Sequence, residues 1–141
     1  RQRQMCIRDS LWFGRGRIFY ALKNYDESIA SFKKVVELKP DLFEGNYYLG
    51  VFYTIKADEM NKVMNEKQYS SQTAYDTDLK EVNAVYMEAG PWFEKAYELK
   101  KDDVNTLDFL KSICFRLRDE EGMMDKYNKY NTLLKEAKGE E

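Results

Sequence analysis

The stretch that decides the fold reads LWFGRGRIFYALKNYDESIASFKKVVELKPD and spans residues 11–41. Its apolar residues recur every three or four positions, as they do on one face of an amphipathic helix. The pattern breaks near residues 23–25, and Asp26 follows as a candidate N-cap. Pro40 ends the second half because proline cannot continue a helix. The stretch therefore predicts two helices joined by a tight turn.

Several positions of this stretch agree with a known helix-turn-helix repeat. They are Trp12, Gly16, Phe19, Tyr25, Ser28 and Phe32. Counted back from Pro40, these residues stand at the Trp, Gly, Tyr, second aromatic, small-residue and Phe positions of the tetratricopeptide repeat (TPR), which the stretch resembles. Arg15 departs from the Leu that the family prefers there. The resemblance implies a bacterial-type TPR protein, whose repeats stack as helix hairpins.

A second unit begins at Phe43 and extends to residue 102. Leu49, Gly50 and Tyr53 reproduce the Leu-Gly-Tyr signature that the family has in the first helix of a repeat. The second helix of this unit has the family's spacing but begins farther along the chain than in a standard repeat. Relative to the family, residues 58–84 are an insertion placed at the turn of this hairpin.

The insertion is expected to lengthen the hairpin without adding a new domain. Apolar residues continue at spacings of three and four through both of its ends, over residues 53–64 and 79–96. Such stripes are typical of two helices that pack along each other. Residues 68–76 are rich in Ser, Thr and Gln and form the predicted loop. The middle repeat is therefore expected to protrude as an antiparallel coiled-coil arm.

Residues 103–138 form a third, degenerate unit in which Lys111 replaces the family's Gly and Cys114 its Tyr. Degenerate terminal repeats commonly cap a solenoid. The predicted fold is all-α, a right-handed α-α superhelix of about three TPR-like hairpins with an extended middle hairpin. Its predicted parts are a first repeat over 11–42, a second over 43–102, a capping repeat over 103–138 and a tail over 139–141.

The opening segment RQRQMCIRDS, residues 1–10, matches none of this patterning. Residues 5–10 resemble a translation of the transposon end sequence used to prepare sequencing libraries, which indicates a sequencing artefact. A frayed or disordered basic arm is the alternative. The segment is left out of the fold prediction. The natural N-terminus, with any signal peptide or upstream domain, is then expected to be missing.

The composition argues against catalysis. The chain has no His, which excludes Ser-His and Cys-His catalytic pairs and His-bearing zinc sites. It also has no metal-ligand spacing, phosphate-binding Gly loop or nucleophile elbow. Cys114 lies on an apolar stripe and is expected to be a buried small hydrophobe. We therefore expect no enzymatic activity, no cofactor and no metal.

Net charge and hydropathy bear on two kinds of partner, nucleic acid and the membrane. The formal net charge is −2, and no face gathers enough Lys and Arg without Asp or Glu between them, so nucleic acid is not an expected partner. No apolar run approaches the roughly 18 residues that a membrane span needs.

The resemblance implies a concave groove, lined by the first helices of successive repeats, that binds peptides or protein segments. By position its residues are Phe13, Arg17, Tyr20, Tyr47, Val51, Thr54, Asp108, Ser112 and Phe115. Phe13, Arg17 and Tyr48 stand where the family's carboxylate clamp needs Lys, Asn and Arg, so chaperone C-terminal tails are not expected ligands. In the loop of the arm, Tyr69 and Tyr75 are either loop-packing residues or contacts for a partner.

The leading functional hypothesis is a non-catalytic protein–protein interaction scaffold. One alternative is the C-terminal accessory region of a longer enzyme or sensor whose catalytic part lies upstream. Another is a module for self-association through the arm. The sequence does not indicate a compartment, because such repeats serve both in the cytoplasm and in the bacterial envelope or periplasm.

Overall fold

The computed structural model of the protein describes residues 2–140, with side chains placed from Ser10 onward. These residues form six α-helices and no strand, so the predicted all-α class is confirmed. The helices are α1 (Gln2–Ala21), α2 (Tyr25–Leu38), α3 (Phe43–Glu66), α4 (Gln72–Leu99), α5 (Val104–Arg116) and α6 (Met123–Lys138). They form an α-α helical repeat in which each helix packs on its neighbours in the chain.

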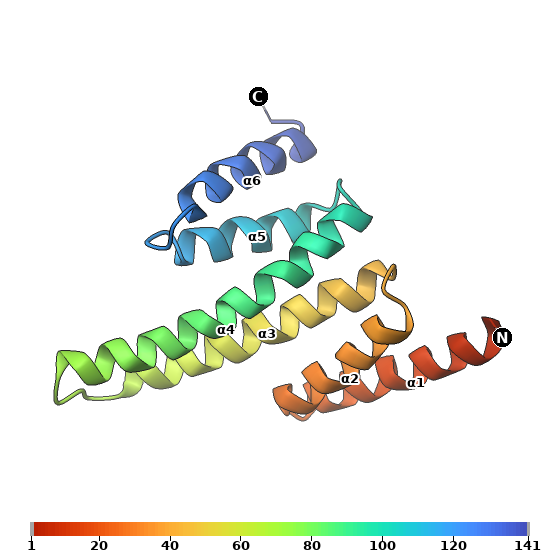
Figure 1. The fold of residues 1–141 in the computed structure, drawn as a ribbon, viewed down its shortest axis with the longest axis horizontal. Helices are drawn as coiled ribbons and strands as arrows, with labels where there is room; N and C mark the ends of the chain where they lie inside the picture. Colours follow the sequence, from red (N-terminus) through yellow and green to blue (C-terminus); the bar gives the residue numbers. More distant parts are fainter. Residues whose placement is uncertain (1, 141) are drawn as a thin grey trace.

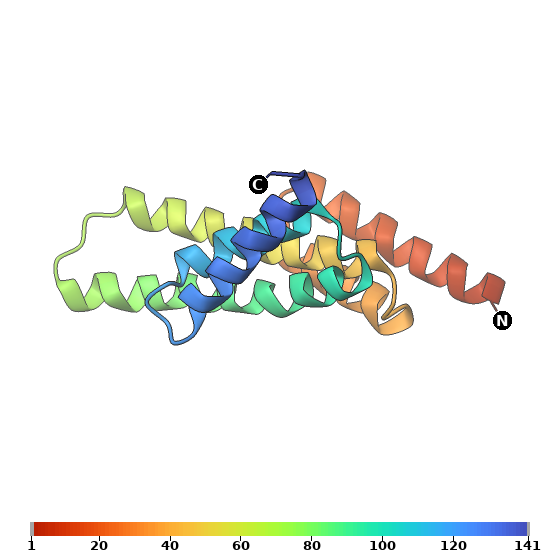
Figure 2. The same ribbon diagram turned by 90° about the horizontal axis from the view of Figure 1, so that it is seen from above.

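The helices pair into three hairpins, α1/α2, α3/α4 and α5/α6, which follow one another in a row (Figure 1). The middle hairpin is the longest, since α3 has 24 residues and α4 has 28, against 14 in α2 and 13 in α5. At 1.5 Å per residue, α4 is about 42 Å long. Its tip projects past both neighbouring hairpins in two perpendicular views (Figures 1 and 2). We call the α3/α4 hairpin, residues 43–99, the arm.

Helix α1 begins at Gln2, earlier than the predicted start of the first unit at Leu11. The backbone of residues 2–10 is therefore helical in the structure. The physical reason is that no Pro or Gly precedes Gly14, so nothing in this segment ends the helix. Residue 1, residue 141 and the side chains of residues 2–9 lie outside the part of the chain described.

The helix caps differ from the sequence expectation at two turns. Asn24, not Asp26, caps α2, because its Oδ1 accepts a hydrogen bond from the N–H of Glu27 at 3.3 Å. Asp26 instead pairs with Lys56 on α3 at 2.7 Å. The loop of the arm is shorter than the predicted 68–76, since the Oγ of Ser71 accepts a hydrogen bond from the N–H of Ala74 at 3.2 Å and starts α4 at Gln72.

The core of each of the first two hairpins is built around one phenylalanine. Phe32 of α2 and Phe93 of α4 are both fully buried. Each ring lies against a glycine of the preceding helix, Gly16 for Phe32 and Gly50 for Phe93. Burying one such ring contributes about 1.5–3 kcal/mol to stability. The glycines allow the two helices of a hairpin to approach closely enough for that burial.

Along the arm, α3 and α4 meet through an alternation of small and large buried residues. These are Ala57, Met64, Val82, Tyr86 and Ala89. The hydroxyl of Tyr86 donates a short hydrogen bond to Oδ1 of Asp58. From the third hairpin, Arg116 donates to Oδ1 of Asn61 at 2.7 Å and lies 5.1 Å from the ring centre of Tyr86. The third hairpin is thus fastened to the base of the arm.

Candidate functional site

We call the face formed by the first helix of each hairpin, α1, α3 and α5, the inner face. Between α1 and α3 it carries a depression with a volume of about 500 Å³. It is lined by Phe13, Arg17, Tyr20, Ala21, Tyr48, Val51 and Phe52. We call it the aromatic depression. Its rings contact each other across the two helices: Phe13 lies 5.9 Å from Tyr48, and Tyr20 lies 5.3 Å from Phe52, measured between ring centres. Arg17 is the one charged residue among those that line it.

Helical spacing explains why these side chains converge. On α1, Phe13, Arg17 and Tyr20 are separated by four and then three positions, which places them on one face. Phe52 is buried and packs on Phe32, with ring centres 4.8 Å apart, so the floor of the depression belongs to the core. Tyr20 remains 44% exposed. The depression therefore offers partly exposed aromatic side chains on a rigid, packed base.

A second depression, of about 270 Å³, lies where α3 and α4 meet α5. It is lined by Thr54, Asp58, Tyr86, Asp108, Phe109, Ser112, Ile113 and Arg116. We call it the polar depression. Burial, together with the hydrogen bond to Asp58, raises the pKa of Tyr86. The phenol of Tyr86 therefore stays protonated and remains a hydrogen-bond donor throughout the physiological range.

The structure divides the nine predicted groove residues into three groups. The aromatic depression includes Phe13, Arg17, Tyr20 and Val51. The polar depression includes Thr54, Asp108 and Ser112. The other two residues, Tyr47 and Phe115, line neither. Tyr47 packs between α4 and α5, 5.9 Å from Phe93 and 6.0 Å from Phe109. Phe115 packs 5.4 Å from Tyr127 of α6.

Sequence reasoning missed several lining residues of the two depressions. Tyr48 was named only as a carboxylate-clamp position, and Phe52 was not named. Both lie beside predicted groove positions, and their spacing of four could have identified them. Tyr86 had no such signal, because it belongs to α4, the second helix of its hairpin, whereas the predicted groove uses only first helices. Arg116 is in the last turn of α5, where its contact with α3 depends on tertiary packing.

At the tip of the arm, Tyr69 and Tyr75 pack on each other with ring centres 5.3 Å apart and planes at 89°. The hydroxyl of Tyr69 donates to Oδ2 of Asp78 at 2.7 Å, and Nζ of Lys67 lies 3.0 Å from the same oxygen. Burial and the Asp78 hydrogen bond raise the pKa of Tyr69 to about 12. The same hydrogen bond, together with that from Lys67, lowers the pKa of Asp78. These internal contacts support the loop-packing interpretation of both rings.

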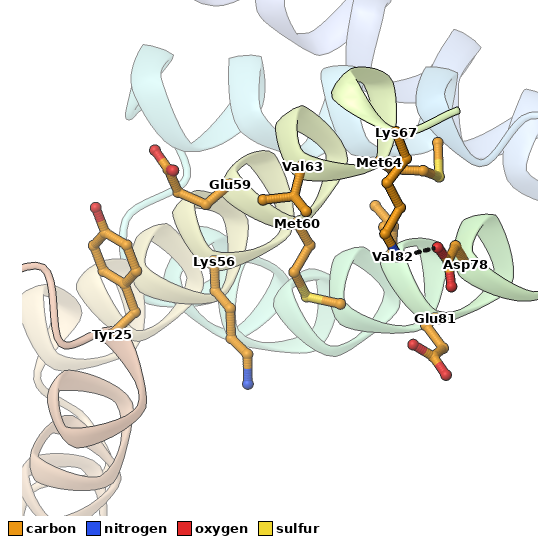
Figure 3. Close-up of a pocket in the computed structure, with 10 residues that line it drawn as sticks. All are labelled: Tyr25, Lys56, Glu59, Met60, Val63, Met64, Lys67, Asp78, Glu81 and Val82. Atoms are coloured by element: carbon orange, nitrogen blue, oxygen red, sulfur yellow. Dashed lines mark hydrogen bonds and ion pairs between the residues drawn. The ribbon is translucent and has the colours of Figure 1, made fainter. Parts of the chain in front are cut away.

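A third hollow, of about 340 Å³, lies on the flank of the arm (Figure 3). We call it the arm slot. It is lined by Tyr25, Lys56, Glu59, Met60, Val63, Met64, Lys67, Asp78, Glu81 and Val82. Met64 and Val82 are buried, whereas Val63 is 56% exposed. The sequence pattern assigned the methionines to the helix seam and did not identify the slot, because Val63 lies outside the apolar stripe of α3.

Among the described residues, no group of three or more His, Cys, Asp and Glu side chains is arranged to hold a metal ion. Cys114 is buried, and burial raises the pKa of its thiol, so the thiolate is disfavoured. No helix in the described part of the chain is long and apolar enough to cross a membrane.

Residues 16–54 match the family model of the TPR repeat. The matched segment runs from the middle of α1 to the middle of α3. It contains Gly16, Phe32 and Gly50, and also the parts of α1 and α3 that enclose most of the aromatic depression. No curated protein matches the chain.

Proposed function

We propose that this protein is a non-catalytic scaffold that holds a segment of another protein on its inner face, against α1, α3 and α5. The proposal is carried by one observation: partly exposed aromatic side chains line an open depression within the segment that matches a TPR repeat. TPR repeats generally serve as interaction modules. One depression on this face is aromatic and the other is polar. A bound segment whose two ends differ in polarity would therefore bind in one orientation.

The aromatic depression provides the anchor. A partner's apolar side chain placed against Tyr20 and Tyr48 leaves water, and burial contributes about 25 cal/mol per Å² of apolar surface. Aromatic residues on a packed base lose little conformational freedom when they bind, which is why they dominate interface energetics. Arg17, beside them, carries several N–H donors and can bind a carbonyl or carboxylate oxygen of the partner.

The polar depression provides the second contact. Asp108 and Ser112 are exposed on α5 and present a carboxylate and a hydroxyl to the inner face. Arg116 and Tyr86 are held in place by Asn61 and Asp58, so the wall of this depression is organised before binding. A segment with an apolar residue at one end and polar or basic groups at the other matches both depressions.

Selection from a displayed peptide library tests the proposal, followed by affinity measurements on the selected peptides. We expect Tyr20→Ser and Arg17→Glu each to weaken binding by about tenfold or more, as loss of a central interface residue does. The matched control is Ile18→Ser, since Ile18 is on the same helix, 63% exposed and outside the depression. Failure to select any peptide, or binding that is indifferent to Tyr20 and Arg17, would contradict the proposal.

A further inference from the structure

We infer that the arm slot is a second docking surface and that its occupant is a basic amphipathic helix. This inference is independent of the function proposed for the inner face. The slot lies along the seam between two antiparallel helices, α3 and α4 (Figure 3). A third helix packs naturally into such a seam, because the side-chain ridges of one helix fit the groove between the others.

The floor of the slot is apolar and adaptable. Met60 and Val63 project from α3 between the charged residues at the two ends of the slot, and Val82 of α4 lies near Lys67 and Asp78 (Figure 3). Val63 is more than half exposed, so its side chain is available to a partner. Methionine side chains adjust their shape to a ligand at little cost. The floor therefore suits the apolar face of a helix.

The charges on the rim decide the character of the occupant. Both lysines of the slot already have acidic partners within the chain: Lys56 lies 2.7 Å from Asp26, and Lys67 lies 3.0 Å from Asp78. Glu59 and Glu81 form no ion pair among the described residues. The slot thus presents two uncompensated carboxylates beside an apolar floor. Lys or Arg residues that flank the apolar face of a helix complement them.

A second copy of the chain is a poorer match to the slot. A symmetric pair would bring two surfaces of the same negative sign together, and each copy would keep its Glu59 and Glu81 unpaired. An acidic helix is disfavoured for the same reason. We therefore commit to a basic partner helix, whose apolar residues contact Met60 and Val63 and whose cations contact Glu59 and Glu81.

The test uses two synthetic amphipathic helices of about 18 residues, long enough to form a helix. One is built from Leu and Lys and the other from Leu and Glu, and calorimetry measures their binding to the full chain. We expect the Leu/Lys peptide to bind with one peptide per chain and the Leu/Glu peptide to bind at least tenfold more weakly. Because Arg17 lines the aromatic depression and not the slot, Arg17→Ser should leave this binding unchanged, which separates a failure here from a failure on the inner face.

Matched variants locate the binding. We expect Glu81→Lys to weaken binding of the Leu/Lys peptide about tenfold, whereas Glu44→Lys, which changes the net charge equally on an exposed part of α3, should change it less than twofold. Val63→Ser should also weaken it, and circular dichroism checks that each variant is folded. Absence of binding, or equal effects of Glu81→Lys and Glu44→Lys, would overturn the inference. A dimer of the unliganded chain that Val63→Ser abolishes would overturn it in favour of self-association.

Discussion

The ring of Phe93 lies so close to the backbone of Gly50 that a Cβ atom on residue 50 would come within 2.9 Å of it. The first hairpin contains the same pair, since a Cβ on Gly16 would lie 2.3 Å from the ring of Phe32. The two glycines are one TPR period apart in the sequence. The two phenylalanines are farther apart because most of the long arm lies between Gly50 and Phe93. The contact is thus preserved although the hairpin that contains it is extended.

Gly50→Ala is expected to destabilise the protein by about 1–3 kcal/mol, because the new methyl group overpacks the core against Phe93. Gly14→Ala is the matched control, since a Cβ there would have no heavy atom within 4 Å. It should raise stability by about 0.5–1 kcal/mol, as Ala does in place of a helical Gly. Urea unfolding measures both. A neutral Gly50→Ala would show that α3 and α4 do not pack in this way.

Pro91→Ala is expected to stabilise the protein by about 1–3 kcal/mol. Pro91 is exposed inside α4 and cannot donate the hydrogen bond that an alanine would make to the carbonyl of Met87. The midpoint of thermal unfolding measures the gain. A loss of stability would instead mean that the proline holds the arm in a direction on which the packing of α5 depends.

Arg116→Ala is expected to lower the free energy of unfolding by about 1–2 kcal/mol, because it leaves Asn61 without its charged donor and removes the cation from Tyr86. Arg118→Ala is the control. Its side chain is exposed, and its loss should change stability by less than about 0.5 kcal/mol. Equal effects of the two variants in urea unfolding would argue against a connection between the third hairpin and the arm.

Stability is expected to fall at alkaline pH in part through Tyr130. Burial raises the pKa of this phenol to about 12, whereas in the unfolded chain it is about 10. The unfolded state therefore releases the proton first, and the free energy of unfolding decreases as pH rises from about 10 to 12. Tyr130→Phe removes this contribution. Compared with the parent at pH 7, the variant should become relatively more stable at pH 11, and a difference that does not change with pH would contradict the assignment.

Much of the fold was predictable because its determinants are local. Gly16, Phe32 and Pro40 have roles that depend on spacing within one hairpin. The ends of the arm's loop were harder to predict, because Ser71 caps α4 from within a run of polar residues that offers several candidate caps. Asp26 had the chemistry of a cap, but its carboxylate pairs with Lys56 of the next hairpin.

The site was less predictable than the fold because its residues come from helices distant in the sequence. Arg17 and Tyr20 were accessible from the periodicity of α1. Tyr86 of α4 and Arg116 of α5 line the same depression, and their proximity depends on how α5 packs against the α3/α4 hairpin. The arm slot was not identified from the sequence, because Met60 and Met64 read as an ordinary helix seam and Val63 lies outside that stripe.

The most direct test of the central claim is amide chemical-shift mapping of the isotope-labelled protein during titration with a peptide selected for binding. Our account predicts that the largest shifts cluster on α1 and α3 around the aromatic depression, at Phe13, Arg17, Tyr20, Tyr48, Val51 and Phe52. Smaller shifts should follow at Asp108 and Ser112. Shifts confined to the tip of the arm or to α6, with none on α1, would contradict a scaffold that binds through its inner face.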